Sequence, residues 1–288
     1  MKRASTYDLA PMASPSLHVP KISAIEAEGA LAAARKVVET HHKLAAWLHP
    51  GVTLAQIDQQ VAKVLDDLRC ASCFLHYKGA KRVPFPSYAC LSLNECVVHG
   101  TAGYYPHPVK DGDVLKIDIG VRYRGWIGDA AWTYVFGQPS PLVKKLTDCG
   151  KESLARGVQE LRPGNTFLSW AKMVQDIVET KYGFHLVRGL GGHGYGRELH
   201  DRPFVSNVVP TYPGEWPEAF EPCRPGTLVA VEPMIAVGTG QTLERPKEWP
   251  VYSKDGSLTV HYEHDVYITE NGPKVLTEGL EQVRDVIV

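Results

Sequence analysis

The segment Val109-Lys-Asp-Gly-Asp-Val-Leu-Lys-Ile-Asp118 has a counterpart in the second half of the chain, Cys223-Arg-Pro-Gly-Thr-Leu-Val-Ala-Val-Glu232. In both segments a glycine turn leads into an apolar, strand-like run, and a carboxylate follows the glycine by six residues. Farther upstream, Pro50-Gly-Val-Thr53 is echoed by Pro163-Gly-Asn-Thr166. The paired segments are offset by 113 and 114 residues, so we expect two related halves that each present an acid. Buried acids cost free energy unless a positive group faces them, which suggests a shared site with metal ions as the partner.

The composition of the chain limits its class. Among 288 residues, 31 Lys and Arg nearly cancel 32 Asp and Glu, so there is no basic footprint for nucleic acid. No apolar run approaches the ~20 residues that a membrane-spanning helix needs. Residues 1–21 lack the apolar core of a signal peptide and are expected to form a flexible N-terminal extension. We therefore expect a cytoplasmic protein that has neither nucleic acid nor a membrane as a partner.

The six cysteines are too few for a disulfide scaffold. Cys70-Ala-Ser-Cys73 has no second ligand pair at the spacing of a zinc site, which leaves a weak redox role open. The simplest interpretation is that all six are reduced, partly buried thiols.

Hydrophobic periodicity predicts the same order of elements twice. Helices are expected at residues 22–49, 53–68, 141–161 and 166–182. Short strands and loops are expected over residues 70–98, a hairpin with its turn at Arg124-Gly125 over 114–136, and strands over 228–237 and 257–269. Helices and antiparallel strands grouped in this way predict an α+β fold. We expect residues 22–288 to form a single catalytic domain built from two related halves.

Asp118 and Asp129 flank the predicted hairpin turn, with their midpoint between residues 123 and 124. Residues equidistant from such a turn face each other with Cβ atoms about 4.5–5.5 Å apart. Two carboxylates that close repel each other unless cations lie between them. The alternative is a solvated acidic pair on an open face, which the apolar neighbours on both strands disfavour: Ile117, Ile119, Ile127, Ala130 and Ala131.

Two further acids and one histidine segment have similar character. Glu232 and Glu263 lie in strand-like surroundings, where a lone acid is more often a paired structural group than a ligand. In Gly191-Gly-His-Gly-Tyr-Gly-Arg-Glu-Leu-His200, four glycines around a histidine allow close backbone approach. This segment lacks the register of a phosphate-binding loop. It favours His193 as a metal ligand and His200 as a substrate or acid–base group, although either histidine alone could be a core residue.

Three other histidines carry less weight in the sequence. His99, in Asn94-Glu-Cys-Val-Val-His-Gly100, is uninformative by itself. His261 and His264 flank Glu263, and strand alternation is taken to point them away from the site, so we assign them no role.

Taken together, these motifs make the chain resemble type I methionine aminopeptidases from about residue 22 onward. The resemblance is carried by Asn94-Glu-Cys-Val-Val-His-Gly100, Lys116-Ile-Asp118, Gly128-Asp129, Gly192-His-Gly-Tyr-Gly-Arg-Glu-Leu-His200, Val231-Glu-Pro-Met234 and Tyr262-Glu-His264. It implies the pita-bread fold, in which two pseudo-symmetric halves place an antiparallel sheet inside outer helices.

The resemblance also assigns residues to roles. The five implied metal ligands are Asp118, Asp129, His193, Glu232 and Glu263. The two site histidines, expected to contact substrate and to act in catalysis, are His99 and His200. The implied methionine pocket consists of Cys90, Leu199, Met234 and Trp249, with Cys73 or Tyr77 as further candidates because about six extra residues separate Cys73 from Cys90. Asp201 stands where the family often has Glu, with little expected consequence.

The implied activity is removal of N-terminal methionine from nascent proteins and short peptides, with a small second residue preferred. Two divalent ions are implied, and the oxygen-rich ligand set suits Mn²⁺, Fe²⁺ or Co²⁺, with Zn²⁺ also open. Glu232 would act as general base, and His99 and His200 would steady the substrate carbonyl as oxyanion donors do. The resemblance implies a monomer whose partners are chains with a free N-terminal methionine, with the ribosome as a further candidate.

Three alternatives compete with this interpretation. An Xaa-Pro aminopeptidase or dipeptidase of the same fold would carry a sizeable N-terminal domain, whereas only about 20 residues precede the first expected helix here. A type II enzyme would carry a long insertion between the positions of His200 and Glu232, which are 32 residues apart. A metal-free binding protein of the same fold would have lost ligands, and all five are present.

Overall fold

The computed structural model describes residues 19–78 and 83–288, so the predicted extension at residues 1–21 lies almost wholly outside the described residues. The first half contains α1 (Ala24–Trp47), α2 (Leu54–Asp67), β1 (Ala71–Ser72), β2 (Cys90–Leu93), β3 (Cys96–Val98), β4 (Val114–Tyr123) and β5 (Trp126–Phe136). The second half begins with α3 (Pro141–Val158), α4 (Phe167–Gln175), a π-helical segment (Asp176–Lys181), β6 (His185–Leu186), β7 (Gly191–Gly194) and β8 (Asp201–Ser206). After a 3₁₀ turn at Pro217–Phe220 it continues with β9 (Leu228–Val231), β10 (Met234–Ala236), β11 (Thr242–Glu244), β12 (Val251–Ser253), β13 (Thr259–His261), β14 (His264–Thr269), β15 (Gly272–Val275), a second 3₁₀ turn (Leu280–Gln282) and β16 (Val286–Ile287).

The helices begin where capping residues stand in the sequence. The Ser23 hydroxyl accepts from the Glu26 N–H and the Glu26 carboxylate accepts from the Ser23 N–H, which satisfies two amides at the start of α1. Thr53 and Gln56 form the same arrangement before α2. Thr166 precedes α4 without a side-chain cap, and α4 itself covers only the first part of the predicted helix at 166–182.

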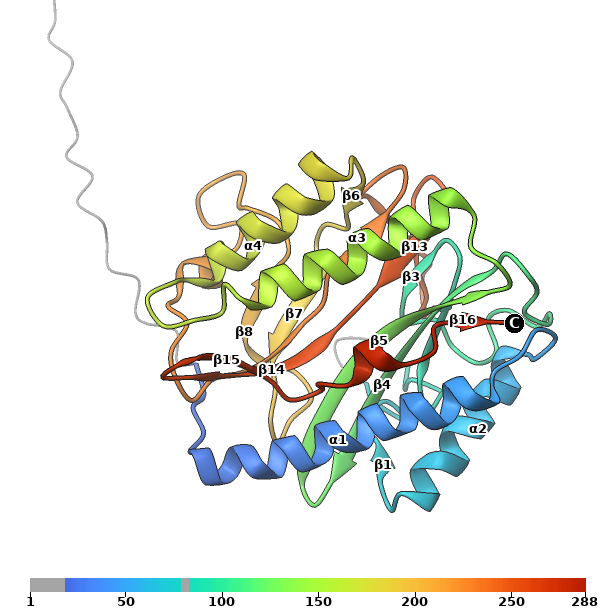
Figure 1. Ribbon diagram of the computed structural model, residues 1–288, viewed down its shortest axis with the longest axis horizontal. Coiled ribbons are helices and arrows are strands. Elements are labelled where there is room, and N and C mark those ends of the chain that lie inside the picture. Colours follow the sequence, from blue (N-terminus) through green and yellow to red (C-terminus); the bar gives the residue numbers. More distant parts are fainter. Residues whose placement is uncertain (1–18, 79–82) are drawn as a thin grey trace, which may run out of the picture.

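The strands form two larger sheets and two smaller ones within the described residues. In one larger sheet the order is β1-β4-β5-β16, with β2 also paired to β4, and in the other it is β15-β14-β9-β7-β8. The smaller sheets have the orders β13-β10-β6 and β11-β12-β3. α1 packs on β4 and β5, whereas α3 packs on β10 and β13, so each of these helices covers strands of its own half (Figure 1). The predicted pita-bread arrangement, with strands inside outer helices, is confirmed.

The backbone repeats between the halves as well as the sequence does. Gly51 and Gly164 have φ of +95° and +94°, and Gly112 and Gly226 have φ of +92° and +93°. These left-handed values favour glycine, because a Cβ atom would be strained there. The matched conformations lie at the matched positions, so the glycine turns repeated in the sequence share one backbone conformation.

The hairpin of β4 and β5 is confirmed, but the predicted pairing of its acids is wrong. The two-residue turn is Arg124-Gly125, and Tyr123 pairs with Trp126. As a result Asp118 lies opposite Ala131 and Asp129 lies opposite Gly120, so the two acids are diagonal neighbours on one face. The prediction placed the centre of the turn one residue too early, and the register of a hairpin is set by its turn.

Two predicted strands are interrupted in the structure. The strand expected at 228–237 breaks between β9 and β10 at Glu232 and Pro233, and the strand expected at 257–269 breaks between β13 and β14 at Tyr262 and Glu263. Val231 pairs with His264, so Glu232 and Glu263 stand next to each other where the two strands leave the ladder.

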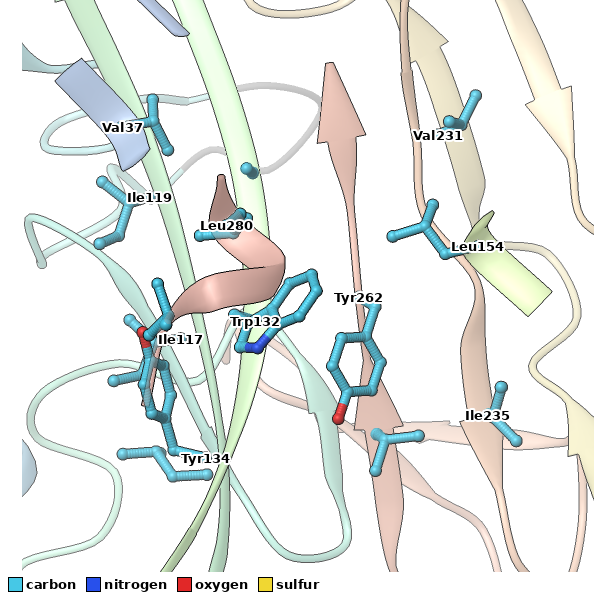
Figure 2. Packing of buried hydrophobic residues seen from close by; sticks show 14 of the residues in the cluster. Val37, Ile117, Ile119, Trp132, Tyr134, Leu154, Val231, Ile235, Tyr262 and Leu280 are labelled. Atoms are coloured by element: carbon cyan, nitrogen blue, oxygen red, sulfur yellow. The ribbon is translucent and has the colours of Figure 1, made fainter. Parts of the chain in front are cut away.

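An aromatic pair joins the halves in the core. The rings of Trp132 and Tyr262 lie edge to face with centroids 4.8 Å apart. Figure 2 shows this pair between two groups of apolar side chains, one from each half: Val37, Ile117, Ile119 and Tyr134, and Leu154, Val231 and Ile235. Because Trp132 follows the acidic part of β5 and Tyr262 precedes Glu263, this packing holds ligand-bearing segments of both halves together.

Two further predictions bear on the chain as a whole. All six cysteines lie in the described part of the chain and carry free thiols. Across residues 19–78 and 83–288, none of the helices is both long enough and apolar enough to span a bilayer.

Candidate active site

One cavity of about 460 Å³ gathers the candidate residues from both halves. Its volume falls in the range of small-molecule sites. The predicted residues that line it are Cys90, His99, Asp118, Asp129, His193, Leu199, His200, Glu232, Met234, Trp249 and Glu263. It is also lined by Phe74, Tyr77, Phe85, Val98, Gly189, Leu190, Gly191, Asp201, Phe204 and His261.

Main-chain hydrogen bonds and strand pairing hold the four acids in place. Asp118 lies inside β4, paired with Cys90 on one side and with Ala131 on the other. The Glu263 N–H donates to the Ala131 carbonyl at 2.9 Å, which ties the residue before β14 to β5. The Asp129 N–H donates to Asp265 Oδ2 at 2.8 Å. The Glu232 carbonyl accepts from the side chain of Asn207 at 2.9 Å. The carboxylates therefore face the cavity from segments that are fixed by their main chain.

His193 reaches the cavity because its flanking glycines let strands approach closely. A Cβ atom at Gly192 would lie 2.2 Å from the Ala230 carbonyl oxygen, and one at Gly194 would lie 2.0 Å from the Arg202 carbonyl oxygen. The His193 Nδ1 lies 3.1 Å from the Gly194 carbonyl oxygen, which favours the tautomer with its proton on Nδ1 and a lone pair on Nε2. Nε2 lies 4.0 Å from both Asp129 Oδ2 and Glu232 Oε1.

The four carboxylates repel one another, and a bound cation would relieve this repulsion. Burial and the nearby Glu232 carboxylate raise the pKa of Asp118 to about 8, and burial raises the pKa of Glu232 to about 8. Burial and the neighbouring acids raise the pKa values of Asp129 and Glu263 well above their usual range. Asp118 Oδ1 and Asp129 Oδ1 are buried without a hydrogen-bond partner among the described residues. Unpartnered buried carboxylate oxygens are the ligands that hard divalent cations take, so the donor set fits metal ions.

The distances divide the possible ligands into two overlapping clusters. Ligand atoms of Asp129, His193 and Glu263 all lie within 4.8 Å of one another. Those of Glu232, His261 and Glu263 meet the same limit, so Glu263 belongs to both clusters. Asp118 belongs to neither cluster, although it lines the same cavity.

His261 is the residue that sequence reasoning missed, and its assignment away from the site is wrong. Its Nε2 lies 2.9 Å from Glu232 Oε2, and its ring lines the cavity. The signal was present, because His261 precedes Glu263 by two residues and strand side chains two apart share a face. Burial lowers the pKa of His261 to about 3, and the buried Lys116 ammonium adds to the effect, so this ring is neutral.

His264 lies outside the cavity lining, unlike His261. Its Nδ1 lies 2.8 Å from Thr277 Oγ1, and its Nε2 lies 3.0 Å from Glu281 Oε1. A buried histidine that is satisfied in this way is a structural residue.

Apolar and aromatic side chains make up much of the remaining cavity lining. Phe85 packs edge to face against Trp249 with ring centroids 5.2 Å apart, and against Phe74 with centroids 6.3 Å apart. Neither phenylalanine was predicted, because both lie in the segment whose length departs from the family pattern. Of the two further pocket candidates, Tyr77 lines the cavity, whereas Cys73 packs behind it.

The two site histidines line the cavity and have different neighbours. The His200 ring lies 4.4 Å from the His193 ring between centroids, and its Nδ1 lies 2.6 Å from the Tyr77 hydroxyl oxygen. His99 adopts φ of +58°, an uncommon left-handed conformation for a residue with a Cβ atom. Its ring packs edge to face against Trp249. Such backbone conformations cluster at functional sites.

Sequence comparison places this site among known metallopeptidases. Residues 28–270 match the profile of metallopeptidase family M24. A methionine aminopeptidase of Aquifex aeolicus is 37% identical over 247 residues, which cover 85% of this chain and 93% of that protein. The chain belongs to metallopeptidase family M24, among its methionine aminopeptidases. For this M24 metallopeptidase, the family therefore supports a cavity that holds divalent metal.

Solved structures of methionine aminopeptidases and of Xaa-Pro peptidases both superpose on this chain, but with different sequence identity. The crystal structure of methionine aminopeptidase from Thermotoga maritima superposes with a TM-score of 0.81 at 31% identity, covering 90% of this chain and 99% of that one. The Xaa-Pro dipeptidase from Bacillus anthracis superposes with a TM-score of 0.71 at 20% identity, covering 93% of this chain and 64% of that one. The second similarity shows the shared fold alone.

Proposed function

We propose that this M24 metallopeptidase removes the N-terminal methionine of proteins and peptides by metal-dependent hydrolysis, with a preference for a small second residue. The observation that carries the proposal is one cavity with two unlike kinds of lining residue. Its lining includes the carboxylates of Asp118, Asp129, Glu232 and Glu263 with four imidazoles, and it also includes apolar side chains and the sulfur-containing side chains of Cys90 and Met234. A polarizable, sulfur-rich lining suits an unbranched thioether, and an acidic lining suits a free α-amine.

The residues that would hold two divalent ions are Asp118, Asp129, His193, Glu232 and Glu263. Their mostly oxygen donors favour Mn²⁺, Fe²⁺ or Co²⁺, and Zn²⁺ is also compatible. When bound, such ions would polarise the peptide carbonyl and acidify the attacking water.

The protein side chains would move the protons and hold the substrate. Glu232 is the proposed base, because its carboxylate borders the cavity and an acid in this position can take a proton from water and pass it to the leaving amine. His99 and His200 would donate hydrogen bonds to the substrate carbonyl and to the charge that develops there. Leu199 and Trp249, with Cys90 and Met234, would enclose the methionine side chain.

The cellular setting is part of the proposal. Six free thiols support a reducing compartment such as the cytoplasm. Nascent chains are the expected substrates there, which makes the ribosome a candidate partner, and we propose that the enzyme acts as a monomer.

A peptide panel tests the specificity of the enzyme. Met-Ala and Met-Gly peptides should be cut, formyl-Met-Ala should resist cleavage because its amine is blocked, and Met-Trp should be cut slowly. An Xaa-Pro peptide of equal length serves as the control for the rival activity of the same fold. Faster cleavage of Xaa-Pro than of Met-Ala, or cleavage after formyl-Met, would overturn the proposal.

A further inference from the structure

His261 lines the cavity next to Glu232, one of the proposed metal ligands. The residue is 1% exposed, and its Nε2 is buried without a hydrogen-bond partner among the described residues. The nearest charged atom is Glu232 Oε2 at 2.9 Å, but the two are not aligned as donor and acceptor. A buried polar atom left in this state costs free energy unless something else satisfies it.

The distances around His261 match those between ligands of one cation. Two ligand atoms that each lie about 2.1 Å from an ion and subtend a right angle are roughly 3 Å apart. The separation of His261 Nε2 and Glu232 Oε2 agrees with this value, and Glu263 completes a group of three whose ligand atoms lie within 4.8 Å of one another. The group mirrors the cluster of Asp129, His193 and Glu263, which likewise joins one imidazole to two carboxylates.

The main chain fixes His261 in this position. The His261 carbonyl accepts from the Thr133 hydroxyl at 2.7 Å, and the His261 N–H donates to the oxygen of that hydroxyl at 3.1 Å. β13 pairs antiparallel with β10, which sets His261 opposite Met234 in the cavity wall. A side chain on a backbone held from both sides is preorganised, so little entropy is lost when it binds an ion.

We propose that His261 is a sixth metal ligand, which binds through Nε2 together with Glu232 and Glu263. The inference rests on the proposed metal centre and adds a second imidazole to its five ligands. Imidazole suits Fe²⁺, Co²⁺ and Zn²⁺ better than it suits Mn²⁺. His261 would therefore shift the metal preference of this enzyme away from Mn²⁺.

Nitrogen NMR of the Zn²⁺-loaded protein counts the ligating imidazoles directly. The whole protein is labelled with ¹⁵N-histidine, stripped of metal and titrated with Zn²⁺, a diamagnetic probe. Two Nε2 signals should move to the metal-bound position, one absent in His193→Gln and the other absent in His261→Gln. His264→Gln is the matched control, because it also removes a buried histidine, but one whose ring lies outside the cavity and contacts Thr277. It should leave both shifted signals in place.

A calorimetric titration provides a second readout. His261→Gln should weaken Co²⁺ binding by about 10–100-fold and Mn²⁺ binding by less, because the lost donor is a nitrogen. Equal weakening for the two metals would contradict a ligand role and indicate that His261 only orients Glu232.

The wild-type count decides the inference even if His261→Gln does not fold. A single metal-bound imidazole in the wild-type protein would overturn it and would leave the proposed peptidase intact, provided that Met-Ala peptides are still cut. Absence of any shifted signal, with no stoichiometric Zn²⁺ binding, would overturn both the inference and the proposed metal centre.

Discussion

The two halves of the molecule deliver equivalent acids along different backbone paths. In the first half, β4 and β5 form one continuous hairpin, and Asp118 and Asp129 are diagonal neighbours on one face. In the second half, β9 and β14 pair only after an excursion through β10–β13, and Glu232 and Glu263 follow and precede the paired residues Val231 and His264. A regular ladder offers only alternate residues to one face, whereas strands that leave the ladder can turn successive residues inward.

The difference explains how the chemistry is divided between the halves. The regular hairpin presents two carboxylates and no imidazole to the cavity. The irregular half presents Glu232 and Glu263, together with His193, His200 and His261. The proposed base therefore lies in the half whose strands are broken, and the matched acid of the regular half is left with a ligand role.

Substitution of the matched acids Asp118 and Glu232 should have the largest effect on catalysis, and it tests directly whether the two halves differ in role. Glu232→Gln should lower kcat by about 10²–10⁴-fold, because it removes the proposed base as well as a ligand. Asp118→Asn removes the acid at the equivalent position but no base. Steady-state kinetics at increasing Co²⁺ should recover part of the activity of Asp118→Asn and little of that of Glu232→Gln. A Glu232→Gln enzyme within a few-fold of wild type would show that the base is misassigned.

The stability of the metal-free protein should depend on pH, an effect smaller than the loss of catalysis in Glu232→Gln. The pKa values of Asp118 and Glu232 are raised to about 8 from ordinary values of 3.8 and 4.5. Between about pH 5 and pH 8 these groups therefore hold protons in the folded state and release them on unfolding. The folded state therefore binds more protons, and stability should fall as pH rises from about 5 to 8. Thermal unfolding in chelator at pH 5.5 and 8 measures this change.

The metal-loaded protein is the control for that measurement. Cations favour the ionised acids, so loading should release protons at pH 7 and remove the loss of stability at pH 8. Metal-free protein that is more stable at pH 8 than at pH 5.5 would contradict the proposed crowding of the acids.

The smallest expected effect concerns the helix starts. Thr53 caps α2 with its side chain, whereas the equivalent Thr166 makes no such hydrogen bond at α4. Thr53→Ala should lower the free energy of unfolding by about 1 kcal/mol, and Thr166→Ala by clearly less. Denaturant titration of both variants measures the difference. Equal losses would mean that the repeat extends to the caps.

The parts of the fold that follow local rules were predictable from sequence. Capped helices, the Arg124-Gly125 hairpin and the glycine repeats depend on neighbouring residues, and they lie within a few residues of the predicted positions. The 166–182 helix was less accurate, since the chain continues from α4 as a π-helical segment. The strand breaks at Glu232 and Tyr262 depend on tertiary packing between sheets, which periodicity does not register.

The composition of the site was partly within reach of the sequence. The five metal ligands implied by the family resemblance all line one cavity. His261 could have been found from its two-residue spacing to Glu263. Phe74 and Phe85 could not, because only the folded loop before β2 decides which aromatic side chains of that segment reach the cavity.

Metal removal is the most direct test of whether acids of both halves, with imidazoles of the second half, hold ions on which cleavage depends. The purified enzyme is stripped with a chelator and assayed on a Met-Ala peptide before and after addition of Mn²⁺, Fe²⁺ or Co²⁺, with bound metal quantified in each sample. Activity should vanish on stripping and return as metal binds, in wild type but not in Glu232→Gln. Full cleavage by protein shown to contain no metal would contradict the account.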